Sequence, residues 1–165
     1  MRVILFCLLT AGCAPLFTLD KPKETPSEEI ISTAEQFEGL TEKYHRRELA
    51  QAIGVDPVRT EWCAAFVNAV LEMNDIQGSG SVSHNPLLAR SFLSWGNPVN
   101  EAQSGDIVVF PRGNQGWQGH VGIHASTVYI NGERWYWVLG GNQNNSVSFE
   151  LYPARRALGI RRPHA

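Results

Sequence analysis

The order of elements along the chain predicts an α+β fold, in which helices come first and an antiparallel sheet follows. Apolar residues recur at helical spacing through the first half of the chain, whereas the second half holds short segments rich in β-branched and aromatic residues. Glycine, asparagine and proline separate these later segments and favour turns between them. The sequence shows no internal repeat and no low-complexity tract, so we expect one domain with this layout.

Helix signals are clear before residue 75. The letters TPSE predict a helix with Thr25 as N-cap, Pro26 at the first helical position and Glu28 as the capping-box partner. Another helix is expected over about residues 41–53, where GVDP ends it. A further apolar helix is expected to begin near Thr60 and to end at NDIQGSGS, and a short helical piece should surround PLLARSFLSWG.

Strand signals dominate after residue 105. The expected strands are GDIVVF, GHVGIHAS, TVYING, RWYWVLGG and SVSFELY. The letters INGE predict a tight hairpin turn between two of them.

The composition is that of a globular domain. Of the 165 residues, 43% are hydrophobic and 18% are charged, which excludes a disordered chain. The formal net charge of −2 gives no indication of nucleic-acid binding.

The N-terminal letters MRVILFCLLTAGCAPL predict an export signal. LLTAGC resembles the bacterial lipobox, so we expect residues 1–13 to be a signal peptide, with Cys13 as the lipidated residue that attaches the protein to a membrane in the cell envelope or periplasm. Residues 14–27 are then a proline-containing tether, and residues 28–165 are the folded domain. The alternative is a retained apolar arm that packs on partner proteins, for instance in a phage virion.

Cys63 is the strongest candidate for a chemical role. With Thr60 as N-cap, it falls in the first helical turn, where free N–H groups and the helix dipole favour a thiolate and lower the pKa of the thiol. A cysteine is also a common buried apolar residue, so both interpretations stay open on position alone. If the signal is removed and Cys13 carries a lipid, Cys63 is the only thiol left, so neither an internal disulfide nor a zinc or iron–sulfur site is expected.

A nucleophilic cysteine needs a base, and histidine is the usual one. His120 follows Gly119 at the start of a predicted strand, where small neighbours allow close approach of another segment. His124 shares the same strand face, but only one of the pair can meet Cys63. The remaining histidines lie in polar or terminal positions and are expected to be solvated: His45, His84 and His164.

The base in turn needs a polar group that orients it, and LGGNQNNSV supplies candidates. Asn142 is the first candidate and Gln143 the second. The alternative is that this stretch is an ordinary asparagine-rich turn.

Cysteine at a helix start, then histidine, then asparagine on later strands is the chain order of papain-like cysteine hydrolases. The segments EWCAAFVNAVL, ARSFLSWG, SGDIVVFPRG, GHVGIH, VLGGNQNNSV and LGIRRP lie in order over about residues 35–163 and resemble the CHAP and NlpC-like family of cell-wall hydrolases. The resemblance implies a papain-like α+β fold of the CHAP/NlpC type, with N-terminal helices packed on a small antiparallel sheet.

The resemblance also implies site roles. Cys63 matches the family nucleophile, His120 the base and Asn142 the residue that orients it. Many family members carry a glutamate two residues before that asparagine, where this chain has Gly140, so the orienting group here would be a neutral amide.

Weaker expectations concern residues near the site. Candidates for substrate contacts are Glu61, Trp62, Trp117 and Gln143. Asp106 is interpreted as a structural turn residue. A basic C-terminal patch, expected to be a solvated face rather than an anion site, consists of Arg155, Arg156, Arg161 and Arg162.

The function implied by the resemblance is cysteine-dependent hydrolysis of amide bonds in peptidoglycan, as an endopeptidase or as an N-acetylmuramoyl-L-alanine amidase. Neither a cofactor nor a metal is implied. The chain can come from a bacterium or from a phage. The alternative from another class is a non-catalytic cell-wall-binding or virion structural protein that retains the fold.

Overall fold

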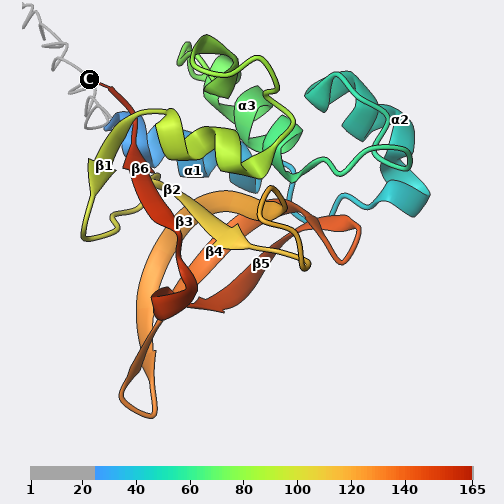
Figure 1. Cartoon of the computed structure of the whole chain (residues 1–165). Helices are drawn as coiled ribbons and strands as arrows, with labels where there is room; N and C mark the ends of the chain where they lie inside the picture. The colour runs from blue at the N-terminus through green and yellow to red at the C-terminus, as the bar shows by residue number, and fades with distance from the viewer. Residues whose placement is uncertain (1–24, 165) are drawn as a thin grey trace, which may run out of the picture.

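Helices occupy one side of a twisted antiparallel sheet in a computed structural model that describes residues 25–164 (Figure 1). The helices α1 (Pro26–Glu35), α2 (Glu42–Ile53) and α3 (Cys63–Met73) come first, and the sheet order is β1-β6-β2-β3-β4-β5. The strands are β1 (Asn97–Val99), β2 (Ile107–Pro111), β3 (Gly119–Ile130), β4 (Glu133–Gln143), β5 (Ser146–Pro153) and β6 (Gly159–Arg162). Short 3₁₀ turns complete the chain: η1 (Ser79–Ser81), η2 (Ala89–Ser94) and η3 (Ala154–Arg156). The α+β prediction is confirmed.

The expected signal peptide, the expected lipidation site Cys13 and residues 14–24 of the expected tether lie outside the described residues. The first helix begins at Pro26, inside the range 14–27 that was expected to be a tether. Over residues 25–164, no helix is both long and apolar enough to cross a bilayer.

The first helix starts as its sequence predicts. The Thr25 hydroxyl accepts a hydrogen bond from the N–H of Glu28, and the Glu28 carboxylate accepts one from the N–H of Thr25 at 2.8 Å. This reciprocal pair satisfies two backbone donors that the helix itself cannot. The second predicted helix is confirmed as α2, with Thr41 as its N-cap.

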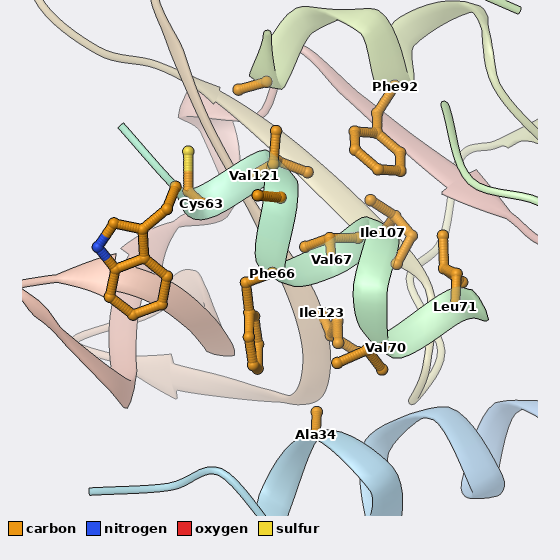
Figure 2. Close-up of a cluster of buried hydrophobic side chains, with 14 of the residues drawn as sticks. Ala34, Cys63, Phe66, Val67, Val70, Leu71, Phe92, Ile107, Val121 and Ile123 are labelled. Carbon is orange, nitrogen blue, oxygen red and sulfur yellow. The ribbon is translucent and has the colours of Figure 1, made fainter. Parts of the chain in front are cut away.

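The central helix α3 begins later than predicted. Its N-cap is Trp62, not Thr60, and no side chain in the described part of the chain caps it. Tertiary packing explains the difference, because the Trp62 side chain is fully buried and its indole N–H donates to Glu42 of α2 at 2.7 Å. Figure 2 shows the apolar side chains of α3 directed into the core between the sheet and α1. Cys63 is therefore the first residue of the helix.

The predicted strands of the sheet are confirmed, with one difference. GHVGIHAS and TVYING form a single strand, β3, whose register shifts between His124 and Ser126. A β-bulge of this kind bends a strand without ending it, and the sequence alone suggested two strands. The predicted INGE hairpin is present, with Asn131 and Gly132 both at positive φ (52° and 80°), as a tight turn requires. The short strands β1, at one edge of the sheet, and β6, between β1 and β2, were not among the predicted strands.

Both faces of the sheet are packed. Alternate residues of β2 and β3 face the helices, including Ile107, Val121 and Ile123. Their neighbours, including Val108 and Phe110, pack with side chains of β4 and β6 on the opposite face. Strand β3 contributes Val121 and Ile123 to the core under the helices, and on the opposite face the rings of His120 and His124 contact Tyr152 and Tyr136 of the second cluster.

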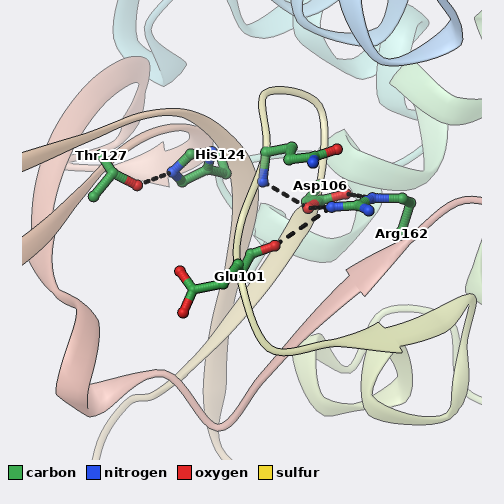
Figure 3. A network of polar contacts seen from close by, with 6 residues as sticks. Glu101, Asp106, His124, Thr127 and Arg162 are labelled. Atoms are coloured by element: carbon green, nitrogen blue, oxygen red, sulfur yellow. Dashed lines mark hydrogen bonds and ion pairs between the residues drawn. The ribbon is translucent and has the colours of Figure 1, made fainter.

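An ion pair between Arg162 of β6 and the buried carboxylate of Asp106 joins β6 to the turn before β2 (Figure 3). The Asp106 carboxylate is fully buried and accepts two hydrogen bonds from the Arg162 guanidinium, at 2.9 and 2.8 Å. The N–H of Gln103 donates to the same carboxylate at 2.8 Å. The structural role predicted for Asp106 is confirmed. The expectation that Arg162 belongs to a solvated basic face was wrong, because the pairing with Asp106 is made across 56 residues and no local pattern reports it.

Replacing Arg162 by alanine should destabilise the fold. The substitution leaves the Asp106 carboxylate buried without its partner, which costs about 3 kcal/mol in the free energy of unfolding. Arg155→Ala is the matched control, because Arg155 is 67% exposed in its side chain and its pair with Glu133 should contribute less than about 0.5 kcal/mol. Chemical denaturation of both variants measures the difference; equal stabilities would contradict the structural role of the Asp106–Arg162 pair.

Candidate functional site

The Cys63 thiol lies at the start of α3, at the edge of a cavity of about 360 Å³. The residue itself is only 3% exposed, and Figure 2 shows its side chain beside Val121 of β3. The other residues lining the cavity come from the N-terminal side of η2, from the segment between β2 and β3, and from the turn before α3: Glu61, Leu87, Leu88, Ala89, Arg112, Gly113, Trp117, Gln118 and Gly119.

Burial raises the pKa of the Cys63 thiol above its ordinary value. The backbone N–H groups of Val121 and Ala64 and the charge of Arg112 act in the opposite direction, and the carboxylate of Glu61 adds to the rise. The expectation that the helix start lowers this pKa was wrong in its net result, because loss of hydration outweighs the contribution of the helix N–H groups. The resting residue is a thiol.

The imidazole of His120 is buried beside Val121, the residue whose N–H contacts the Cys63 sulfur. Its Nε2 lies 2.9 Å from Oε1 of Gln143. Burial is the main cause that lowers the pKa of His120 to about 4; the Gln143 hydrogen bond opposes this and the charge of Arg112 adds to it. The imidazole is therefore neutral at pH 7.

The orientation of the Gln143 amide determines which nitrogen of His120 carries the proton. The amide nitrogen of Gln143 donates to the backbone carbonyl of Ser148. The amide oxygen therefore faces His120, and because it can only accept, Nε2 must be the donor. Nδ1 is then the unprotonated nitrogen of the neutral ring, and it has no hydrogen-bond partner within residues 25–164. No direct hydrogen bond joins the thiol of Cys63 to this ring within the same residues.

Tyr152 supports the imidazole from the second apolar cluster. Its ring stacks on that of His120, with 5.4 Å between centroids, and its hydroxyl donates to Oε1 of Gln143 at 3.0 Å. The hydroxyl also lies 3.2 Å from a carboxylate oxygen of Glu150. Burial raises the pKa of Tyr152, and the neighbouring Glu150 adds to the rise, so the hydroxyl keeps its proton.

Asn142 makes no hydrogen bond with His120, contrary to the prediction. It sits at positive φ (57°) where the β4–β5 register shifts between Gly140 and Gln143. The inserted residue reverses the alternation of the strand, so Gln143 takes the face toward His120. The Asn142 amide instead donates to the Glu61 carboxylate at 2.8 Å. An asparagine-rich stretch was the available signal for positive φ, but counting alternate residues cannot detect the inserted one.

Two glycines allow the strand to approach its neighbours this closely. A side chain at Gly141 would begin 2.5 Å from the Trp62 ring and 2.6 Å from Phe66 of α3. A side chain at Gly140 would begin 3.0 Å from Oε1 of Gln143 and 3.3 Å from Nε2 of His120. The Gln143 amide therefore occupies the space that a glutamate at position 140 would need.

The candidates for substrate contacts separate into two groups. Trp117 is 61% exposed and lines the cavity, as does Glu61. The expectation that Trp62 lines a substrate groove was wrong, because its ring is buried between Glu42 and Gly141.

The other histidines are not brought to Cys63. His124 is held away from the site by Thr127, whose hydroxyl lies 2.9 Å from its Nε2, and by an edge contact with Tyr136. Nδ1 of His45 accepts from the N–H of Thr41 at the start of α2. The remaining two are exposed: His84 and His164.

Arg112 and Glu61 are residues of opposite charge on the cavity wall. Their side chains form an ion pair at 3.3 Å. Arg112 was not singled out from the sequence, because an arginine in a glycine-containing loop is ordinarily a solvated residue.

No family model matches this chain, and no match was found among curated proteins. Among solved structures, the chain is similar to an NlpC/P60 family protein from Bacillus cereus ATCC 10987, with a TM-score of 0.48 and 16% sequence identity. The alignment covers 82% of this chain but only 39% of that protein, so this chain spans about two fifths of its length.

The depressed pKa of His120 predicts a loss of stability in acid. Its pKa is about 6.5 when unfolded and about 4 in the fold, so between these values the unfolded chain binds a proton that the native protein does not. The free energy of unfolding should therefore fall by about 3 kcal/mol as the pH drops through this window. Denaturation curves between pH 4 and 7 measure it.

Two histidine variants test whether His120 causes this dependence of stability on pH. His120→Gln should remove much of it, whereas His84→Gln, at an exposed position, should keep all of it. Burial also lowers the pKa of His124, so part of the slope should remain in His120→Gln. A slope that His120→Gln leaves unchanged would show that this imidazole is not held neutral by burial.

Proposed function

We propose that this protein is a cysteine-dependent hydrolase that cleaves amide bonds in peptidoglycan. The observation that carries the proposal is the imidazole of His120, whose Nε2 is bonded to Gln143 while Nδ1 is left unprotonated beside the segment that contacts Cys63. A thiol at the edge of a cavity, with a neutral base of fixed tautomer one residue before Val121, whose N–H contacts the sulfur, is an arrangement suited to acyl transfer. The substrate class rests on the resemblance of the sequence segments to cell-wall hydrolases.

The first chemical step begins from a neutral pair. Because the thiol is protonated and His120 is neutral at rest, Nδ1 takes the thiol proton as the sulfur attacks the amide carbonyl. A carbon–sulfur bond forms and the carbonyl oxygen becomes an oxyanion. The N–H of Cys63, as the first residue of α3, has no acceptor within its own helix and is the donor that stabilises that oxyanion in this proposal.

The second half of the reaction returns both residues to their resting forms. The imidazolium of His120 gives its proton to the leaving amine as the carbon–nitrogen bond breaks, which leaves a thioester on Cys63. Water then attacks the thioester, with His120 as base, and releases the carboxylate product and the thiol. Throughout, Gln143 keeps the hydrogen bond to Nε2, which becomes charge-assisted when the ring is protonated.

The setting of this reaction belongs to the same proposal. The cleaved bond lies within the stem peptides for an endopeptidase, or between sugar and peptide for an N-acetylmuramoyl-L-alanine amidase. A lipid on Cys13 would place the enzyme at the cell envelope, and a retained N-terminal arm would place it in a phage particle. Both concern residues outside 25–164.

A non-catalytic wall-binding role is the second candidate. The observation that favours it is the raised pKa of the buried Cys63 thiol, together with the missing direct hydrogen bond to His120 within residues 25–164. In that case the cavity would hold a wall fragment without cleaving it.

Incubation with purified peptidoglycan separates the two candidates. The wild-type domain from about residue 21 should release soluble fragments, and Cys63→Ala should release none while keeping the same unfolding curve. Mass spectrometry of the new fragment ends names the bond. Equal release by both proteins, or none by either, would refute cysteine-dependent hydrolysis of peptidoglycan.

A matched pair of histidine variants checks the base. His120→Ala should reduce the rate at least 100-fold, on the scale of general-base catalysis. His124→Ala should change the rate little, because its imidazole is bonded to Thr127 on another part of β3. The reverse pattern would assign the base to His124.

A further inference from the structure

We propose that Arg112 selects substrates that carry a carboxylate close to the amide that is cleaved. This inference rests on the proposed hydrolase and deepens it by naming the chemical class that the cavity accepts.

Among the described residues that line the cavity, Arg112 is the one cation, and most of the others are apolar or neutral. Glu61 is the one acidic residue in this described lining, and its side chain is 78% exposed. The carboxylate of Glu61 is therefore well hydrated at the rim, whereas the Arg112 side chain is 43% exposed and borders the space next to the thiol. A guanidinium beside an apolar cavity favours an anionic ligand.

The Arg112 guanidinium has N–H donors that Glu61 does not use. Within residues 25–164 its one partner is Glu61, at 3.3 Å, a distance longer than a strong charge-assisted hydrogen bond. The same Glu61 oxygen accepts from Asn142 at 2.8 Å, so Glu61 is held from the other side. Arg112 can therefore turn toward a bound ligand while the Glu61 carboxylate keeps a hydrogen-bond partner.

The cavity also suits the rest of such a ligand. Leu87 and Trp117 are large exposed apolar residues on its wall, at 38% and 61% exposure. They can cover the aliphatic part of an amino-acid residue whose carboxylate meets Arg112 and whose amide meets Cys63.

A bound carboxylate would assist the chemistry as well as the binding. The charge of Arg112 lowers the pKa of His120 and so opposes formation of the imidazolium. A carboxylate paired with Arg112 offsets that charge when His120 takes the proton from Cys63. The preference should therefore appear in the turnover rate as well as in binding.

The test uses two muropeptides that are identical except that the carboxylate next to the peptide amide is free in one and a carboxamide in the other. Binding is measured by calorimetry on Cys63→Ala, which cannot turn over, and cleavage is measured on the chain with Cys63 intact. Each is repeated with Arg112→Gln, and with Arg155→Gln as a control for loss of one positive charge far from the cavity. Arg112→Gln, alone or combined with Cys63→Ala, should unfold along the same curve as the wild type.

We expect the free carboxylate to bind 10- to 100-fold more tightly than the carboxamide, the range of one or two charge-assisted hydrogen bonds. Arg112→Gln should reduce this ratio to less than about 3-fold, because it weakens binding of the muropeptide with the free carboxylate and leaves binding of the carboxamide form unchanged. Arg155→Gln should keep the ratio. Arg112→Lys should restore part of it, because lysine supplies the charge without the bidentate geometry.

The two proposals fail separately. If both muropeptides are cleaved at similar rates, and Arg112→Gln leaves the ratio of the two rates unchanged, the selectivity is overturned and the proposed hydrolase activity stands. Selective binding to Cys63→Ala without any cleavage by the intact protein supports the role of Arg112 and refutes the hydrolase. Neither binding nor cleavage of either muropeptide overturns both.

Discussion

The hydrogen bond from Nε2 of His120 to Oε1 of Gln143 determines what the candidate site can do. An imidazole has two nitrogens, and it can serve as a base only through the one that lacks a proton. The backbone carbonyl of Ser148 fixes the direction of the Gln143 amide, so the proton of the neutral ring is placed on Nε2 and Nδ1 stays free. The low pKa of His120 keeps this neutral form at pH 7.

Several features of the fold hold the Gln143 amide in place. The register shift in β4 turns Gln143 toward His120, and Gly140 leaves room for its side chain. Gly141 lets the same strand contact Trp62, the residue immediately before Cys63. The strand that carries the orienting amide is thereby fixed against the helix that carries the thiol, and both residues of the proposed reaction depend on one short segment of β4.

The sequence predicted the features of the fold that depend on local chemistry. The capping box at Thr25, the alternating strands and the placing of Cys63 at a helix start follow from spacing within a few residues. The failures involve contacts that spacing cannot report. The choice of Asn142 over Gln143 failed because one inserted residue reverses strand alternation, and the expected low pKa of Cys63 failed because burial depends on the whole fold.

The central claim is that Gln143, and not Asn142, fixes the protonation of His120. Correlation spectra that resolve the imidazole nitrogens of ¹⁵N-labelled protein at pH 7 test it directly, on wild type, Gln143→Ala and Asn142→Ala. We expect the proton on Nε2 in wild type and in Asn142→Ala, and a mixture of both tautomers in Gln143→Ala. A proton on Nδ1 in wild type, or a change confined to Asn142→Ala, would contradict this account of the site.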